Sequence, residues 1–341
     1  MIKKILFLVI IFFFALGICL CVGRYPISPE HIMELFLSGL GINNHGFSIT
    51  REMMVIFWNI RVPRIILTIM VGAAISTAGA VFQAVFRNPL AAPDILGVTA
   101  GSSFGAAMAI MFFIPVAFII QTSAFVFGIT AVALAYILAA LSRDNSPSVL
   151  VISGIVISAV FQAGLSFFMY IANPYDQLSQ IIFWTMGSFQ TASWAKIQIA
   201  MSVIVPGIIL LTCFSWRLNI MTQNVEDAMS MGINIVRWRI FYIFISTLMV
   251  ACSVASVGSV AWIGLIVPHI ARYIAGPEHV RLIPVTAFLG GIFLMVMDSI
   301  ARSIILSEIP ISIVTSIFGA PFLGYLVIRA GRGRMIHGSC G

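Results

Sequence analysis

Long apolar runs separated by short polar clusters make up most of the chain. The runs cover residues 5–22, 63–85, 93–114, 117–141, 148–171, 197–216, 239–257, 259–274, 282–304 and 311–328. A helix needs about 20 apolar residues to cross the hydrocarbon layer of a membrane, where every backbone N–H and C=O must find its partner inside the protein. The pattern therefore predicts an all-α integral membrane protein with about ten transmembrane helices.

Composition strengthens this interpretation. Of the 341 residues, 61% are hydrophobic and 9% are charged, whereas a soluble domain carries roughly 25% charged residues. This composition excludes a water-soluble protein. We interpret residues 1–341 as a single transmembrane domain embedded in a lipid bilayer, and the first run as a retained helix, because it exceeds the usual length of a signal-peptide core and no cleavage motif follows it.

The distribution of basic residues predicts the orientation. Ten spans place both termini on one side, and with that side cytoplasmic, twelve of the 18 Lys and Arg residues lie inside. Cytoplasmic loops are enriched in Lys and Arg. We therefore expect a multi-pass protein of the cytoplasmic (inner) membrane with both termini in the cytoplasm. The net charge of +7 then reflects this orientation, and nucleic-acid binding is not expected.

The chain carries no recognisable catalytic motif. Its only lysines are Lys3, Lys4 and Lys196, so it cannot form the glycine-rich, lysine-containing loop that binds nucleotide phosphates. The cysteines and histidines show no metal-ligand spacing. We expect a protein that is not an enzyme and that holds neither a cofactor nor a metal.

A single acid lies deep in the apolar runs. Asp298 precedes Arg302 by four residues, which places both on one face of a helix. We interpret them as a local ion pair near the outer end of a span. The alternative is a coupling-ion site in an ion-driven secondary transporter, because such transporters carry ionisable residues within the membrane.

Small residues at four-residue spacing predict close helix packing. They are Gly72, Ser76 and Ala80 in the second run and Gly101 and Gly105 in the third.

A weak internal similarity indicates an inverted repeat of the kind found in transporters. A shift of 179 residues places three residues on identical ones, Gly79, Val81 and Pro89 on Gly258, Val260 and Pro268.

The stretch RNPLAAPDILGVTAG, residues 87–101, interrupts the apolar pattern with polar residues and two prolines. We expect Pro89 to stop the second helix, and Pro93 with Gly97 to begin a third helix at the inner surface. Asp94 is expected to cap this helix or to pair locally.

The segment RLNIMTQNVEDAMSMGINIVRWR, residues 217–239, carries the signals of a short amphipathic helix between two spans. An Asn cap, acids in the first turn and a terminal Gly favour such a helix. We interpret it as a docking element for another cytoplasmic chain, with the candidate residues Asn224, Glu226, Asp227, Met231 and Gly232.

Three arginines are expected at the outer surface. Arg61 and Arg64 stand at the entry of the second span, and Arg302 ends the ninth. They are interpreted either as interfacial anchors or as groups that meet the carboxylates of a soluble partner.

Several segments together resemble a known family. RVPRIILTIMVGAAISTAGAVFQAVFRNPLAAPDILGVTAGSSFG, NVEDAMSMGI, GLIVPHIARYIAGPEHVRLIPVTAFLGGIFLMVMDSIAR and EIPISIVTSIFGAPFLGYLVIR occur in collinear order between residues 60 and 336. They are similar to the permeases of binding-protein-dependent ABC importers for iron siderophores, haem and cobalamin. The resemblance implies a homodimer that works with two cytoplasmic ATPase subunits and an extracytoplasmic substrate-binding protein.

The resemblance also implies roles for particular residues. Arg61, Arg64 and Arg302 match the arginines that meet the binding protein, and residues 217–238 match the ATPase-coupling segment. The cytoplasmic gate corresponds to LSRDNSPSV, with Ser146, Pro147 and Ser148, where Ser146 is expected to cap the fifth helix and Pro147 to open it. The outer gate corresponds to ANPYDQLSQIIFWTMGSF, residues 172–189.

The implied function is the permease part of an ATP-driven importer that alternates access between two gates. ATP is used by the partner subunit. A ferric siderophore is the leading substrate on family frequency, and haem, cobalamin and an oxyanion such as molybdate stay open, because no arrangement of residues selects among them.

Overall fold

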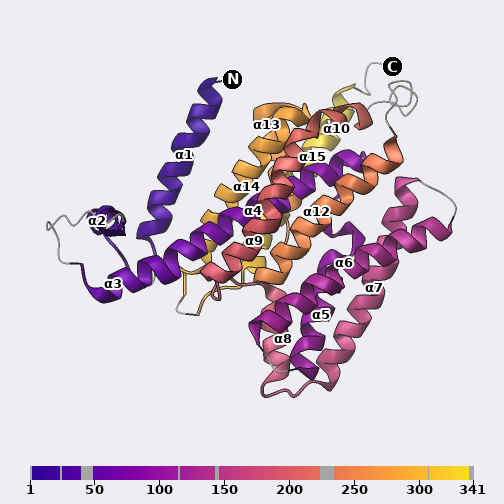
Figure 1. Ribbon diagram of the computed structural model, residues 1–341. Helices are drawn as coiled ribbons and strands as arrows, with labels where there is room; N and C mark the ends of the chain where they lie inside the picture. Colours follow the sequence, from indigo (N-terminus) through magenta and orange to yellow (C-terminus); the bar gives the residue numbers. More distant parts are fainter. Residues whose placement is uncertain are drawn as a thin grey trace.

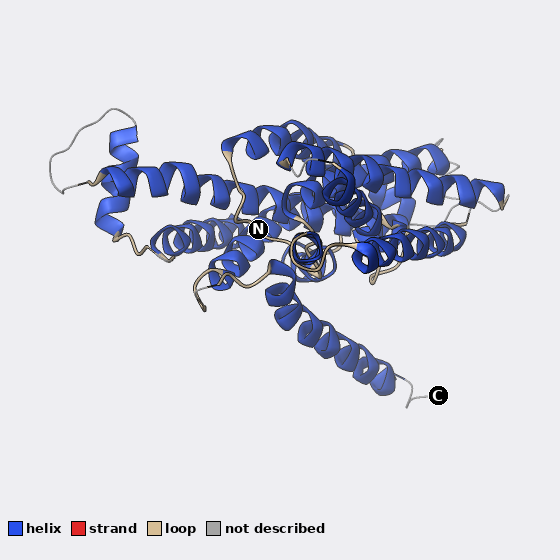
Figure 2. Ribbon diagram, turned by 90° about the horizontal axis from the view of Figure 1, so that it is seen from below, coloured by secondary structure: helices blue, strands red, loops and turns tan. Residues whose placement is uncertain are grey.

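The computed structural model describes residues 2–23, 25–39, 49–113, 116–142, 146–222, 234–305 and 307–337, and within these ranges it contains helices and no strands (Figure 2). The helices run in chain order as α1 (Ile2–Cys21), α2 (Pro29–Gly39), α3 (Arg51–Val55), η1 (Ile56–Arg61), α4 (Val62–Val85), η2 (Pro93–Leu96), α5 (Val98–Phe112), α6 (Ala117–Leu141), α7 (Pro147–Ile171), α8 (Gln177–Met186), α9 (Trp194–Cys213), α10 (Ser215–Thr222), α12 (Ile235–Val257), α13 (Ile263–Ala275), α14 (His279–Ala301) and α15 (Ile311–His337).

Each predicted apolar run overlaps with a helix. Six helices of the described residues are long and apolar enough to cross a membrane: Arg51–Val85, Ala117–Leu141, Pro147–Ile171, Trp194–Cys213, Ile235–Val257 and His279–Ala301. Shorter apolar helices cover Leu6–Cys21, Val98–Phe112, Ile263–Ala275 and Ile311–Leu326. The all-α membrane class is confirmed, whereas the crossing of all ten helices and the inverted repeat stay predictions.

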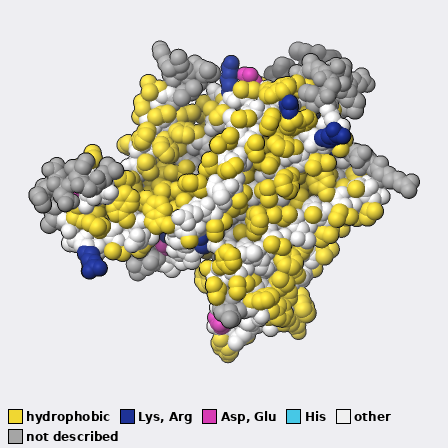
Figure 3. Space-filling model, in the orientation of Figure 1, with side chains coloured by type: hydrophobic (Ala, Val, Ile, Leu, Met, Phe, Trp, Pro, Cys, Tyr) yellow, Lys and Arg dark blue, Asp and Glu magenta, His cyan; other side chains and the backbone are white. Residues whose placement is uncertain are grey.

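The position of the chain termini distinguishes the two ends of the bundle. Helix α1 begins and α15 ends at the same end (Figure 1), which we call the terminal end; the other is the opposite end. On the face shown in Figure 3, hydrophobic side chains cover most of the surface and charged ones gather toward the margins. Such a surface suits a lipid environment.

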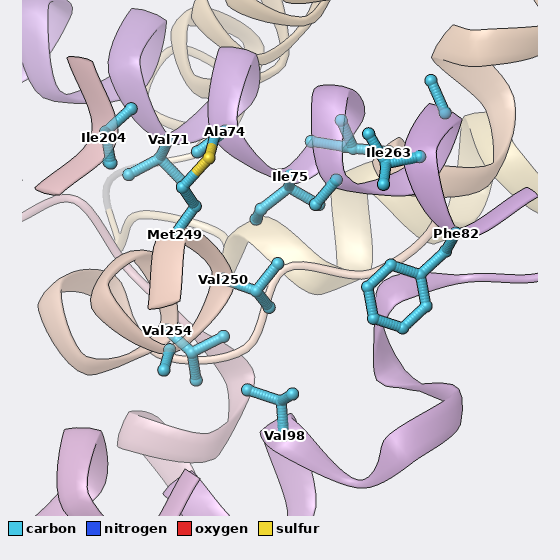
Figure 4. Close-up of a cluster of buried hydrophobic side chains, with 14 of the residues drawn as sticks. Val71, Ala74, Ile75, Phe82, Val98, Ile204, Met249, Val250, Val254 and Ile263 are labelled. Atoms are coloured by element: carbon cyan, nitrogen blue, oxygen red, sulfur yellow. The ribbon is translucent and has the colours of Figure 1, made fainter. Parts of the chain in front are cut away.

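Helix α4 lies at the centre of the bundle, and almost all of its residues are buried. Figure 4 shows Val71, Ala74 and Ile75 of α4 beside Met249 and Val250 of α12. Helices α9, α13 and α14 also pack against α4. The main hydrophobic core is therefore built around this helix.

Glycines allow the backbones around α4 to touch. A Cβ atom added at Gly72 would collide with the carbonyl oxygen of Gly290 in α14, and one at Gly79 would collide with that of Gly264 in α13. Ser76 Oγ donates to the Thr286 carbonyl oxygen of α14 at 3.0 Å. The predicted close packing of this small-residue face is confirmed.

The third helix packs by the same means. Added Cβ atoms at Gly101 and Gly105 would lie 2.5 Å from the Phe127 oxygen and 2.6 Å from the Ser123 oxygen, both in α6. Small residues thus set the distance between α5 and α6, as the sequence predicted.

The turn at residues 86–97 forms as expected, with one correction. Arg87 has φ 48° and Gly97 has φ 83°, both in the left-handed region. The Asp94 carboxylate accepts a hydrogen bond from the Thr99 N–H at 3.0 Å and so caps α5. The predicted span at 93–114 instead begins at Val98, because residues 93–96 form a 3₁₀ turn.

A second boundary was also predicted too early. The span expected at 259–274 begins at Ile263, because Gly258 and Trp262 take left-handed φ values of 80° and 70° and hold the intervening residues outside the helix. Positive φ is uncommon for a bulky residue such as Trp.

We expect Gly79→Ala to destabilise the fold. The new methyl group must separate α4 from α13, and overpacking of this kind costs about 1–3 kcal/mol. Thermal unfolding of the purified protein in detergent, followed by size-exclusion elution, should show a lower midpoint. The control is Gly17→Ala in α1, where an added Cβ meets nothing within 4 Å. Equal midpoints for the two variants would contradict the assigned packing.

Candidate functional site

The three predicted docking arginines come together at the opposite end of the bundle. Arg61 ends the π-helical turn η1, Arg64 lies in the first turn of α4, and Arg302 follows α14. A Cβ atom added at Gly23 would lie 2.7 Å from Arg61 Nη2 and 3.2 Å from Arg302 Nη1. The absent side chain of Gly23 therefore leaves room for two guanidinium groups.

Arg64 is the centre of a buried ion cluster. Its Nη2 lies 2.8 Å from Asp298 Oδ1 and 2.9 Å from Glu308 Oε2. Its Nε also donates to Asp298 Oδ2 at 2.9 Å, and its Nη1 donates to Glu308 Oε1 at 2.9 Å. Each carboxylate is thus bound through both oxygens, which is the strong geometry for an arginine–carboxylate pair.

Arg61 and Arg302 hold the end of α1. Arg61 donates to the carbonyl oxygens of Leu20 and Tyr25, the latter at 2.7 Å, and Arg302 donates to that of Cys19. The last carbonyl groups of a helix have no partner within it, and they carry partial negative charge. The two arginines satisfy these groups and fix α1 against α4 and α14.

All three arginines are buried within the chain, with exposed fractions of 4% for Arg61, 6% for Arg64 and 7% for Arg302. The interpretation as interfacial anchors required the charged heads to reach water, and the structure does not place them there. Their role in docking stays a prediction, and it requires partner carboxylates to compete with internal acceptors.

Asp298 forms the ion pair expected from sequence, together with a stronger one that sequence did not reveal. Its carboxylate lies 3.9 Å from Arg302 Nε, four residues along the helix. The principal partner is Arg64, which is 234 residues away in the chain. Glu308, which completes the cluster, had not been singled out.

The predicted ATPase-coupling residues Asn224, Glu226, Asp227, Met231 and Gly232 lie outside the described residues. Both flanks of this segment are described: α10 precedes it, and α12 follows it with its first turn capped by Asn234.

Helix α10 is bonded to the terminal ends of α4 and α14. Arg87, just after α4, donates to the Met221 carbonyl oxygen at 2.7 Å. The Asn219 side-chain oxygen accepts a hydrogen bond from the His279 N–H at 2.8 Å, where α14 begins. Arg217 stacks on Trp238 of α12, with its guanidinium carbon 3.9 Å from the ring centroid. A displacement of α10 would therefore act directly on α4, α12 and α14.

The start of α7 has the local structure predicted for the cytoplasmic gate. Ser146 caps the helix by accepting from the Val149 N–H at 3.4 Å, Pro147 is the first helical residue, and Ser148 is exposed. Their role as a gate stays a prediction.

The segment predicted as the outer gate contains α8 at the opposite end. After α8, the Ser188 N–H donates to the Val257 carbonyl oxygen at 2.7 Å, and the Gly187 oxygen accepts from the Ile311 N–H at 3.1 Å. These bonds join α8 to the end of α12 and to the start of α15.

Comparison with known proteins identifies the family. The sequence profile of the FecCD transport family matches residues 7–329. The chain belongs to the FecCD transport family.

Individual FecCD relatives agree along nearly the full length. The chain is 36% identical over 336 residues to the molybdate import system permease protein MolB of Haemophilus influenzae, covering 97% of each protein. It is 36% identical to the iron(3+)-hydroxamate import system permease protein FhuG of Bacillus subtilis, covering 95% of each. A solved metal-chelate type ABC transporter in an inward-facing conformation superposes with a TM-score of 0.85 at 35% identity, covering 96% of this chain and 99% of that one.

The family assignment confirms the resemblance found in the sequence: the chain is a FecCD-type ABC importer permease, a transport component rather than a catalytic one. The relatives differ in the substrates for which they are named, so the family alone does not fix the substrate.

We expect Arg64→Met to destabilise the protein strongly. The substitution leaves Asp298 and Glu308 buried without their shared cation, and removal of one partner from a buried pair costs about 3–5 kcal/mol. The thermal midpoint in detergent should fall sharply, or the folded yield should be lost. The matched control is Arg281→Met, which breaks the exposed pair with Glu278 at 3.1 Å and should cost no more than about 1 kcal/mol. Similar midpoints for both variants would refute the structural role of the cluster.

Proposed function

We propose that this FecCD permease works as a homodimer with two cytoplasmic ATPase subunits and an extracytoplasmic binding protein, and that it imports a metal chelate or a metal oxyanion. The family match over residues 7–329 is the observation that carries the proposal. The terminal end then faces the cytoplasm and the opposite end faces outward, in agreement with the excess of Lys and Arg predicted inside. The membrane is the cytoplasmic (inner) membrane.

The proposed substrate class follows from the names of the relatives. The molybdate permease and the iron-hydroxamate permease share the same 36% identity with this chain, so identity does not choose between them. Both are named for the import of a metal-containing compound. A ferric siderophore is the first substrate to test, and molybdate is the second.

The proposed mechanism uses α4 and α14 as connecting elements. Both helices run from the bonds with α10, through Arg87 and His279, to the buried ion cluster. Their backbones touch at Gly72 and Gly290, so they move together more readily than apart. Closure of the ATPase dimer would press on residues 217–238, and these helices would carry the motion to the opposite end.

Docking of the binding protein is proposed at Arg61, Arg64 and Arg302. Carboxylates of the binding protein would replace part of the internal set of acceptors. This set consists of Asp298, Glu308, the last carbonyl groups of α1 and the Tyr25 carbonyl group. Exchange of one carboxylate for another keeps the buried cation neutralised, which limits the cost of the rearrangement.

No observation favours ion coupling through Asp298. Arg64 binds both oxygens of this carboxylate, and Arg302 lies 3.9 Å away. The substitution Asp298→Asn is therefore expected to act on stability.

The composition of the complex tests the proposal. We expect the tagged chain, solubilised from its native host in mild detergent, to co-purify with a nucleotide-binding ATPase in an equal amount, as measured by quantitative mass spectrometry. Recovery of the chain without any ATPase, while substrate uptake continues in ATP-depleted cells, would refute the proposal.

The docking assignment has its own test. In the double variant Arg61→Gln/Arg302→Gln, amide groups still donate to the carbonyl groups of α1, but two positive charges are lost. We expect the concentration of binding protein that gives half-maximal ATPase stimulation to rise about tenfold or more. Arg281→Gln, at the terminal end, is the control and should leave it unchanged. If this half-maximal concentration is also unchanged in the double variant, the docking assignment is wrong and both arginines have a structural role only.

A further inference from the structure

Lys196 is a cation without an anionic partner. It is the only lysine beyond Lys3 and Lys4, and it lies half-buried in the first turn of α9 at the opposite end of the bundle. Its Nζ donates to Thr191 Oγ1 at 2.6 Å and to the Ser256 carbonyl oxygen at 2.8 Å. Within the described part of the chain, no carboxylate lies within ion-pair distance of it.

A pocket of about 280 Å³ opens beside this ammonium group. Helices α5, α6, α8, α9 and α12 contribute to its wall, together with the residues between α8 and α9. The polar residues of the wall are Gln121, Gln180, Ser188, Gln190, Thr191, Lys196 and Ser256. The described wall contains no acid, so its only formal charge is positive.

Gln121 supplies a hydrogen-bond donor that is not used within the described chain. Its amide nitrogen is buried and has no hydrogen-bond partner among the described residues, although the residue lines the pocket. A buried donor without a partner destabilises the protein. A ligand that accepts a hydrogen bond from Gln121 would remove this destabilisation.

The chemistry of the wall selects an anion. An ammonium group has three N–H donors, and two of those of Lys196 are used by Thr191 and Ser256. The third, the Gln121 amide and the first turn of α9 all favour a negatively charged acceptor. An unpaired cation in a membrane helix is a candidate for a functional site, and no internal acid competes for this one.

The pocket has room for a compact anionic group. Pockets for small organic ligands have volumes of roughly 300–1,000 Å³, so 280 Å³ suits a tetrahedral oxyanion or one anionic arm of a larger chelate. The pocket lies against Gln180, Phe183 and Trp184 of α8. It therefore adjoins the segment predicted as the outer gate.

We propose that the pocket around Lys196 and Gln121 is a substrate-contact site that binds the negatively charged group of the imported compound, either a metal oxyanion or a carboxylate of a ferric chelate, as the compound passes the outer gate. The site rests on the proposed import function and deepens it by assigning an anionic substrate. Lys196 and Gln121 are its binding residues.

A structural role for Lys196 makes a different prediction. If it only joined Thr191 to Ser256, its replacement would lower stability without distinguishing charged from neutral substrates. Replacement of a binding residue instead weakens anions selectively.

The test uses the purified permease–ATPase complex in lipid nanodiscs, with equilibrium binding of labelled molybdate, ferric citrate and a neutral ferric hydroxamate. We expect Lys196→Met to weaken binding of molybdate, of ferric citrate or of both about tenfold or more, and Lys196→Arg to retain it. Binding of the neutral compound should be unchanged. Weaker binding of molybdate would identify an oxyanion as the ligand, and weaker binding of ferric citrate would identify the carboxylate of a chelate. Arg51→Met removes an exposed charge elsewhere and should have no effect.

A second variant keeps the proposal testable if Lys196→Met fails to fold. Gln121→Glu is nearly isosteric and places a carboxylate in the same wall, so it should also abolish anion binding while the complex elutes as a single species. Wild-type affinity for both anions in the Lys196 and Gln121 variants, equal losses for anionic and neutral probes, or no anion binding by the wild type would each overturn the proposal. ATP-driven uptake by the wild-type complex is measured in parallel, because its absence would contradict the import function independently of this site.

Discussion

The contact of α4 with α14 and α13 through bare backbone is the constraint on which the rest of the structure depends. At Gly72–Gly290 and Gly79–Gly264, there is no room for a single methyl group. In a membrane, burial of apolar side chains gives little preference for one helix pairing over another, because lipid tails are equally apolar. Close backbone approach then fixes which helices pair, and it places α4 at the centre with its two ends in defined positions.

Polar contacts join α4 to its neighbours at both of these ends. At the terminal end, Arg87 and His279 tie α4 and α14 to α10. At the opposite end, Arg64 joins α4 to Asp298 of α14. The same pair of helices is thus bonded at both ends and closely packed in between. Such an arrangement suits the proposed function, in which an event at the cytoplasmic ATPases would alter a gate on the other side of the membrane.

The sequence was informative where the signal is local. Apolar runs located the helices, four-residue spacing of small residues located the close contacts, and Ser146 with Pro147 located the start of α7. The short helices α2 and α8 were missed as separate elements because they are too short to show a clear period. The Arg64–Asp298–Glu308 cluster was missed because Arg64 lies more than 230 residues from both carboxylates, and the left-handed Trp262 has no sequence signal at all.

Uptake by the reconstituted system tests the central claim most directly. Proteoliposomes would contain the permease and its ATPase. The binding protein and labelled ferric siderophore or molybdate would be added on the side of the membrane that the opposite end of the bundle faces. The account predicts accumulation that requires both ATP and the binding protein and that persists when ion gradients are collapsed. Accumulation that follows an ion gradient and continues without ATP would contradict it.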